Sequence, residues 1–188
     1  GGRISHNGQV LNMAGTNGTL IVSNGGIVAF ADANVGSVAG ASNNFIIIAA
    51  GGVFSNNHSY IGRTSTSGSN TVVVRDSGSV YHVNYPAGGY TFQLGEASGN
   101  NSLYVSNGGV LYSYLTYIGA NNAAASNNYA RIEGAGSMIS NVGEVYVGQG
   151  AHSNTLLVLN GAQSYGGRLG IGWNTAAASN NLVVVAGA

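Results

Sequence analysis

The sequence predicts an all-β protein built as a parallel β-helix, or β-solenoid, of about seven coils. Three observations predict this fold class. One phrase recurs about every 26 residues, apolar residue types return at equal positions of each repeat, and Gly and Asn close each short apolar run. We therefore expect residues 1–188 to form a single β-solenoid repeat domain, as a segment or subunit of a longer fibre.

The first element of each repeat is an Asn-led phrase with a short apolar run that ends near Gly. Successive leading Asn residues are 26, 27, 31, 26, 27 and 26 residues apart. Such a run is typical of a short strand ended by a turn, and the many glycines and β-branched residues disfavour a helix. The seven phrases begin at Asn17, Asn43, Asn70, Asn101, Asn127, Asn154 and Asn180.

The second element is an aliphatic residue followed by Gly, which comes after the turn in each of the first six repeats. We expect its aliphatic side chain to form a third inward stack. The third repeat departs most from the pattern, because the insertion 85–89 lengthens its connection and holds the only proline. The six pairs are Val35-Gly36, Ile61-Gly62, Leu94-Gly95, Ile118-Gly119, Val147-Gly148 and Ile171-Gly172.

An antiparallel meander is the competing fold, because Asn-Gly between two strands is a strong hairpin signal. That dipeptide starts at Asn24, Asn107 and Asn160. A hairpin array gives no reason for one residue type to return about every 26 positions, whereas a solenoid stacks each coil on its predecessor, so that equal positions form columns. The periodicity therefore favours the solenoid.

Two columns of the first phrase are apolar and are expected to point into the core. In a narrow tube the core consists of such stacks, and each buried aliphatic side chain contributes about 1.5–3 kcal/mol before conformational entropy is subtracted. Asn residues at the corners are expected to stack too, since their amides bond to one another and Asn tolerates a left-handed backbone. The first column holds Leu20, Ile46, Val72, Leu103, Ala130, Leu156 and Leu182. The second holds Val22, Ile48, Val74, Val105, Ile132, Val158 and Val184.

The positions between these columns are expected to face outward, yet nearly all of them are apolar or aromatic. Soluble monomers seldom expose a continuous apolar strip, so we expect this strip to be a lateral interface with a loop, a second chain or a neighbouring filament. Its residues are Ile21, Ile47, Val73, Tyr104, Leu157 and Val183, and Arg131 is the exception.

The charge composition excludes two classes of partner. Lys is absent, and five Arg balance five Asp and Glu residues, for a formal net charge of zero at pH 7. Nucleic-acid binding and recruitment to anionic lipid both need clustered cations, so we expect neither. The apolar run 45–50 is far shorter than the roughly 20 residues that cross a bilayer, so we expect no membrane insertion of this segment.

Several phrases are similar to known repeats. Residues 134–138 read GAGSM, residues 145–148 read VYVG, and residues 154–162 read NTLLVLNGA. These phrases resemble the repeats of bacterial autotransporter-like β-solenoid proteins, which typically read GxGS, LxVG and NSLTVxNGG. The resemblance covers nearly the whole chain and implies a right-handed parallel β-helix, extracellular or displayed on the bacterial cell surface, that serves as a passenger stalk, adhesin or fibre.

Pectate-lyase-like enzymes also use a parallel β-helix, and they need clustered carboxylates for calcium binding or acid–base chemistry. Here the carboxylates are scattered over five coils, and Glu133 and Glu144 are the only pair that is close in sequence. We therefore expect no enzyme and no catalytic residue. The four His residues fall at different phases of the repeat, and the Asp-containing nonapeptide of calcium-binding rolls is absent, so we expect no metal and no cofactor.

Tyrosine offers one candidate binding face. Tyr112, Tyr114 and Tyr117 gather in the fourth coil, and an exposed aromatic row stacks on sugar rings. The alternative, which the sequence favours, is that these rings pack against neighbouring coils.

Both ends of the chain fall at equivalent points of the repeat, since Gly1-Gly2 matches the close of a turn and Gly187-Ala188 lies at the same phase. Uncapped solenoid ends expose strand edges that recruit another chain, and a near-zero net charge removes the usual repulsion. We expect head-to-tail self-association and a function as a structural extracellular filament or surface stalk. The first alternative is an adhesin that binds carbohydrate or a host surface through the tyrosine face, and a weaker one is a polysaccharide-degrading enzyme.

Overall fold

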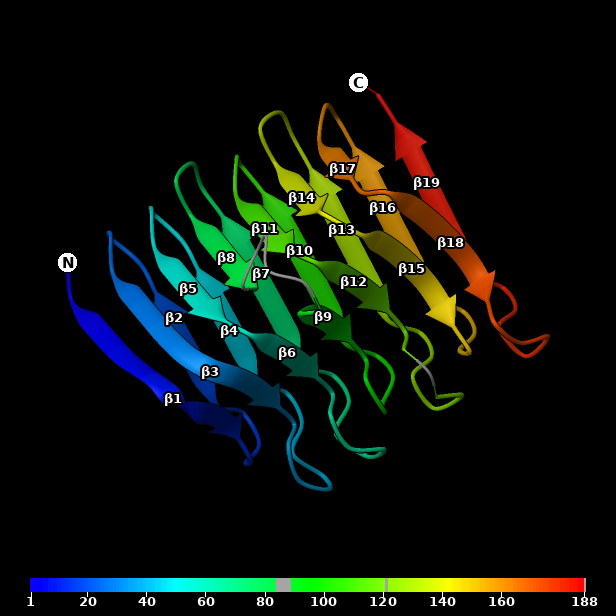
Figure 1. Ribbon diagram of the computed structural model, residues 1–188, viewed down its shortest axis with the longest axis horizontal. Coiled ribbons are helices and arrows are strands. Elements are labelled where there is room, and N and C mark those ends of the chain that lie inside the picture. Colours follow the sequence, from blue (N-terminus) through cyan, green and yellow to red (C-terminus); the bar gives the residue numbers. More distant parts are fainter. Residues whose placement is uncertain (84–88, 121, 188) are drawn as a thin grey trace.

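The computed structural model describes residues 1–83, 89–120 and 122–187, and these residues form nineteen β-strands and no helix. Accordingly, no described helix is long and apolar enough to cross a membrane. Paired strands are parallel and come from successive coils, so that the chain winds along one axis (Figure 1). The predicted β-solenoid of about seven coils is confirmed. The antiparallel meander is excluded by the parallel pairing.

One side of the solenoid is a seven-stranded sheet to which each coil contributes one strand. Its strands are β2 (Thr19–Val22), β4 (Phe45–Ile48), β7 (Thr71–Arg75), β10 (Ser102–Ser106), β13 (Tyr129–Glu133), β16 (Thr155–Leu159) and β19 (Leu182–Ala186).

The other side is a twelve-stranded sheet with two arms. Two long strands, β1 (Arg3–Met13) and β3 (Ile27–Val35), run through both arms, whereas later coils break between them. The first arm continues with β5 (Val53–Asn56), β8 (Val80–Val83), β11 (Val110–Ser113), β14 (Met138–Asn141) and β17 (Gln163–Tyr165). The second arm continues with β6 (His58–Ile61), β9 (Thr91–Leu94), β12 (Leu115–Ile118), β15 (Glu144–Gln149) and β18 (Arg168–Trp173).

The core lies between the two sheets and consists of stacked side chains. Along most strands of the inner coils every second residue is buried, as a strand with one face on the core requires. In coils two to six both predicted columns of the seven-stranded sheet are buried, from Ile46 and Ile48 to Leu156 and Val158; in the first coil Val22 is buried and Leu20 is partly buried. The predicted third stack is confirmed for Val35, Ile61, Leu94, Ile118 and Val147, each at most 1% exposed.

In the last coil the predicted register was wrong by one residue. Val183, not Leu182, pairs with Leu156, and Val185, not Val184, pairs with Val158. Val183 packs against the core, whereas Leu182 is 50% exposed. The predicted outward member Val183 therefore points inward, and Val184 takes its place in the outward column.

The physical reason is an asparagine ladder at the corner between the second arm and the seven-stranded sheet. In each coil the ladder Asn uses its Oδ1 to accept hydrogen bonds from the backbone N–H and the Nδ2 of the ladder Asn one coil earlier. The last member is Asn181, whereas Asn180 has φ 55° and forms the left-handed residue before it. The ladder consists of Asn44, Asn70, Asn101, Asn128, Asn154 and Asn181.

The corner between the two arms is polar inside. Asn141 donates from Nδ2 to Ser113 Oγ at 2.7 Å and to Thr116 Oγ1 at 2.9 Å, and these three side chains are buried. At the same corner in earlier coils, the hydroxyl of buried Tyr81 donates to Ser59 Oγ at 2.9 Å. Side-chain hydrogen bonds thus satisfy buried polar groups where the chain turns from the first arm to the second.

The remaining corner joins the seven-stranded sheet to the first arm through the Asn-Gly turns. Asn24, Asn107 and Asn160 have φ between 51° and 54°, so the Asn-Gly signal reports a tight corner between two sheets rather than a hairpin. Residues 85–88 of the insertion predicted in the third coil lie outside the described residues.

Candidate functional site

The core is open at the C-terminal end of the described solenoid. There β17, β18 and β19 each have one strand neighbour, so one edge of each is unpaired. A hollow of about 150 Å³ opens between the sheets and is lined by Leu169, Val183 and Val185 among others. Val185 is 75% exposed and Ile171 is 50% exposed, although both belong to columns that are buried in the inner coils.

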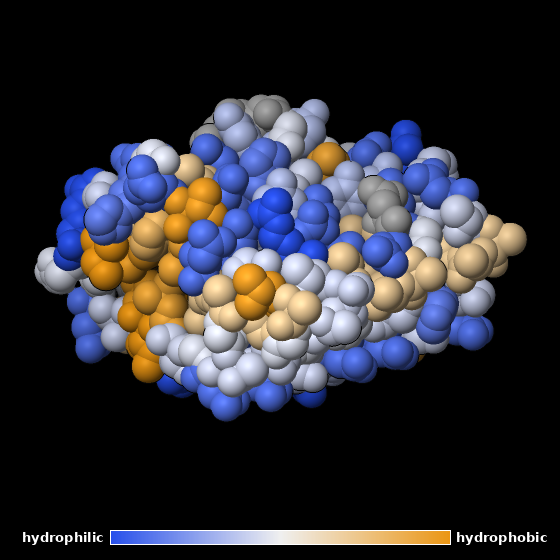
Figure 2. All heavy atoms as spheres, turned by 90° about the horizontal axis from the view of Figure 1, so that it is seen from below, coloured by the Kyte–Doolittle hydropathy of each residue, from blue (hydrophilic) through white to orange (hydrophobic). Residues whose placement is uncertain are grey.

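The N-terminal end is open in the same way. There β1 and β2 are paired on one side only, and a hollow of about 380 Å³ is lined by Ile4, Ile21, Val22 and Ile27 among others. Ile4 stacks on buried Val28 and is 46% exposed. Figure 2 shows orange hydrophobic surface grouped toward this end, on the left. Both ends therefore present apolar side chains beside unpaired backbone edges.

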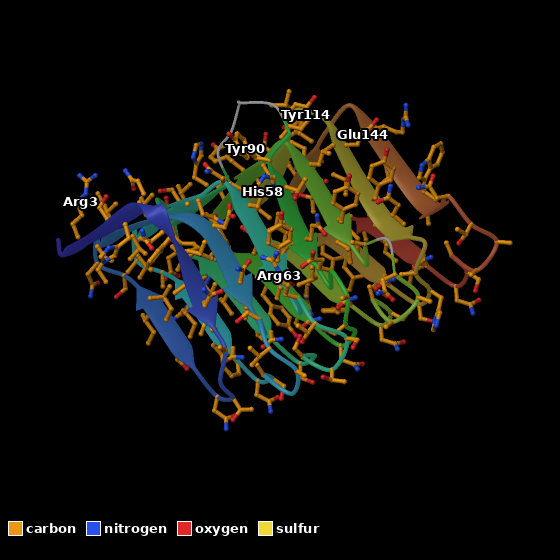
Figure 3. The ribbon with its side chains drawn as sticks, turned by 60° about the horizontal axis from the view of Figure 1, so that its bottom comes forward. Arg3, His58, Arg63, Tyr90, Tyr114 and Glu144 are labelled. Carbon is orange, nitrogen blue, oxygen red and sulfur yellow. The ribbon has the colours of Figure 1, made fainter. Side chains whose placement is uncertain are left out.

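Two tyrosine rings stack on the outer face of the second arm, which Figure 3 shows with its side chains. Tyr117 and Tyr146 pair in register, and their rings stack with centroids 5.4 Å apart and planes 12° from parallel. The Tyr146 hydroxyl donates to Glu144 Oε2 at 2.7 Å, which raises the pKa of Tyr146. Burial, with the nearby Tyr146 and Glu144, raises the pKa of Tyr117. Arg168 adds an ion pair to Glu144 at 3.4 Å.

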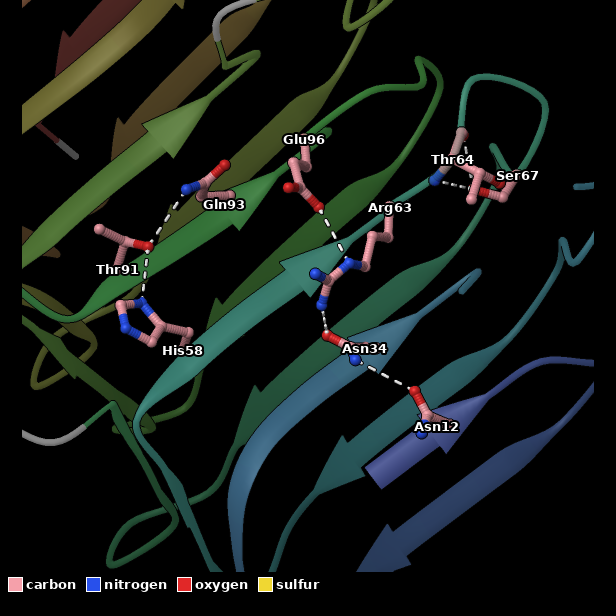
Figure 4. A network of polar contacts seen from close by, with 9 residues as sticks. All are labelled: Asn12, Asn34, His58, Arg63, Thr64, Ser67, Thr91, Gln93 and Glu96. Carbon is pink, nitrogen blue, oxygen red and sulfur yellow. Dashed lines mark hydrogen bonds and ion pairs between the residues drawn. The ribbon is translucent and has the colours of Figure 1, made fainter. Parts of the chain in front are cut away.

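A polar network covers the same arm in the first three coils (Figure 4). The Arg63 guanidinium donates to Asn34 Oδ1, and Asn34 Nδ2 donates to Asn12 Oδ1 at 3.0 Å. Arg63 Nε also lies 3.7 Å from Glu96 Oε2, and its guanidinium lies 4.4 Å from the Tyr60 ring centroid. These contacts run across successive coils and hold them in register.

The predicted glycan face is divided between elements. Tyr112 lies on β11 in the first arm beside His82, with ring centroids 6.0 Å apart, whereas Tyr117 lies on β12 in the second arm. Tyr114 lies between the two strands and accepts a hydrogen bond at its carbonyl oxygen from Gly143 N–H. Because Tyr117 stacks face to face with Tyr146, the two apposed ring faces are not available to a sugar. Glycan binding stays a prediction.

The five carboxylates are spread over the surface, and each has a partner within the chain. Glu96, Glu133 and Glu144 form ion pairs, and Asp32 and Asp76 accept hydrogen bonds from backbone N–H groups of neighbouring coils. Among the described residues, no group of three or more His, Asp or Glu is placed to hold a metal ion.

The outer face of the seven-stranded sheet carries the predicted apolar column. Ile21 is 61% exposed and Tyr104 is 38% exposed. In register the column runs Ile21, Ile47, Val73, Tyr104, Arg131, Leu157 and Val184. A second outer column lies two residues further along each strand. Its members are Arg75, Ser106, Glu133, Leu159 and Ala186. These charged members of the second column were not predicted as site residues, although their two-residue offset from the apolar column was visible in the sequence.

Comparison with known proteins adds no relative: no family model, no curated protein and no solved structure matches this chain. The structure confirms the coarse part of the resemblance, a parallel β-solenoid, while the autotransporter-like identity stays a prediction.

Proposed function

We propose that this chain is a structural rod, part of an extracellular filament or surface stalk, that lengthens by stacking β-solenoid coils end on end. The observation that carries the proposal is that the core columns run through every described coil and present apolar residues in the first and in the last. Val185 and Ile171 at one end, and Ile4 at the other, are substantially exposed beside unpaired strand edges. Unpaired edges and exposed apolar side chains both favour addition of a further coil.

The register of the two ends supports this stacking. If a second copy continues the parallel ladders, its β2 lies next to β19 and its β1 lies next to β17 and β18. Four core columns then continue apolar on apolar, while Ser164 of β17 meets Ile4. Val183 meets Leu20, Val185 meets Val22, Leu169 meets Leu11, and Ile171 meets Met13.

The hydrogen-bond pattern favours resistance to a force applied along the solenoid axis. The ladder hydrogen bonds of both sheets and the asparagine ladder all run from coil to coil, so extension would have to break many of them together. The formal net charge of zero leaves little repulsion between stacked copies.

Electron microscopy and fibre diffraction at rising concentration test the proposal. The expected result is unbranched fibres with an axial repeat of about 4.8 Å. Ile171→Lys combined with Val185→Lys places charges in the stacking surface and should abolish the fibres. The matched control is Val142→Lys, at a 44% exposed residue in an inner coil, which should leave them intact. Discrete short rods from the unmodified chain at every concentration would refute end-on stacking.

A further inference from the structure

On the outer face of the seven-stranded sheet, apolar, aromatic and charged residues follow one another in a definite sequence along the solenoid axis. The rod function does not require this arrangement. The first coils present Ile21, Ile47 and Val73, and the last coils present Leu157 and Val184. Between them lie Tyr104 on the central strand β10 and Arg131 on β13. Apolar residues thus lie on both sides of a central aromatic residue.

Charged residues on this face are also arranged about β10. Arg75 is on β7, one strand before β10, and Glu133 is on β13, one strand after it. Both belong to the same column, because Ser106 pairs with Arg75 on one side and with Glu133 on the other. Arg75 is exposed, and its guanidinium has no hydrogen-bond or ion-pair partner among the described residues.

We propose that two copies of this chain pair face to face through this sheet, antiparallel along the solenoid axis, about a twofold axis that runs parallel to β10. With such an axis, each residue column of one copy faces the same column of the other copy. The strands run in reverse order, so that β7 of one copy faces β13 of the other. This arrangement brings Arg75 of one copy opposite Glu133 of the other, twice by symmetry. It also sets Ile47 opposite Leu157, Ile21 opposite Val184, and Val73 opposite Arg131, whose guanidinium is paired with Glu133 of its own chain.

The opposite orientation does not match the face. If the two rods ran in the same direction, each strand would face its own equivalent with the columns exchanged, so that Arg75 would lie opposite Thr71 and Glu133 opposite Tyr129. Neither contact pairs opposite charges. The charge arrangement therefore selects the antiparallel pair.

The face is large enough for a reversible dimer. Seven strands about 4.8 Å apart and about five residues long cover about 550 Å² per partner, or about 1,100 Å² in all. That area lies just above the roughly 1,000 Å² expected of a specific interface. Glu133 Oε2 already forms an ion pair with Arg131 Nη2 at 2.7 Å. Arg75 of the partner would therefore be the third charged residue of a cluster around Glu133.

Charge reversal tests this pairing independently of end-on stacking. The experiment uses the full chain carrying Ile171→Lys and Val185→Lys, which blocks the ends, and measures the monomer–dimer equilibrium by sedimentation. Arg75→Glu alone sets Glu against Glu, and Glu133→Arg alone sets Arg against Arg, so each should weaken dimerisation at least about tenfold. An equimolar mixture of the two variants should restore dimers, because both contacts then pair opposite charges.

Arg3→Glu is the matched control, since it makes the same charge change on the first arm and should leave dimerisation unchanged. Circular dichroism checks that each variant stays folded. A monomer at every concentration for the end-blocked chain would overturn the proposal. So would dimers that persist in both single variants, or a mixture that stays monomeric.

Discussion

A Cβ atom on Gly95 would overlap the side-chain amide of Asn128, the ladder residue that begins the fifth coil. Gly95 has φ +77°, a left-handed conformation that L-residues rarely adopt. The same approach recurs between Gly119 and Asn154. The aliphatic-Gly phrase and the Asn-led phrase therefore form two halves of one corner, and this explains why both recur with the same period.

Gly95→Ala should consequently destabilise the solenoid on two grounds. The left-handed backbone and the overlap with Asn128 together should lower the free energy of unfolding by about 2–4 kcal/mol, measured by urea denaturation. Gly40→Ala is the control, because Gly40 has φ +80° but no atom within 4 Å of an added Cβ. It should cost only about 1 kcal/mol. Equal losses for the two variants would show that the approach to Asn128 contributes nothing.

Asn128→Ala should remove one complete rung of the asparagine ladder. Asn128 Oδ1 accepts from the N–H and the Nδ2 of Asn101, both at 3.0 Å, and its Nδ2 donates to Asn154 Oδ1 at 3.0 Å. All three residues are at most 1% exposed, so the groups left behind find no water. We expect a loss of about 2–4 kcal/mol in the free energy of unfolding.

The control for this variant is Asn7→Ala on the exposed part of β1, which should change the free energy of unfolding by less than about 0.5 kcal/mol. Hydrogen exchange gives a second readout. In Asn128→Ala the amide of Asn101 should lose protection, while the amides of β2 at the far coil should keep theirs. Unchanged protection at Asn101 would contradict the role of the rung.

Glu96 gives the solenoid a pH dependence of defined sign. Burial raises the pKa of Glu96 above its usual value, and Arg63 offsets this only in part, since its Nε lies 3.7 Å from a buried Oε2 that has no hydrogen bond. A carboxyl with a raised pKa in the folded state binds its proton more tightly there than in the unfolded chain. Stability from this group therefore increases as pH falls through its folded pKa, and it is lost as pH rises.

The check compares unfolding free energies of the unmodified chain and of Glu96→Gln between neutral and mildly acidic pH. As pH falls, the free energy of unfolding of the unmodified chain should increase relative to that of Glu96→Gln. Asp76→Asn, at a residue whose carboxylate accepts a hydrogen bond from Ala50 N–H, serves as a comparison at another site. A difference that is constant with pH would contradict the prediction for Glu96.

The sequence could predict the columns because an equal position is filled by an equal residue type in nearly every coil. The last register was predicted wrongly although the sequence holds its signal. Two other phrases also begin with two Asn residues, Asn43-Asn44 and Asn127-Asn128, and in both the second Asn enters the ladder and the first inward residue follows two positions later. The polar corner between the arms was also missed. One coil uses Ser113 with Thr116, while an earlier one uses Asn56 with Ser59, so no residue type returns there in every coil.

The outer rings of the second arm offer a last prediction, which bears on the tyrosine face. Tyr117 and Tyr146 stack at 5.4 Å, so replacing both by Ala in a double-mutant cycle should show a coupling of about 0.5–1.5 kcal/mol in unfolding free energy. Tyr104 lies on the opposite sheet, and its replacement together with Tyr117 should be additive. Zero coupling between Tyr117 and Tyr146 would mean that the two rings do not stabilise each other in the folded chain.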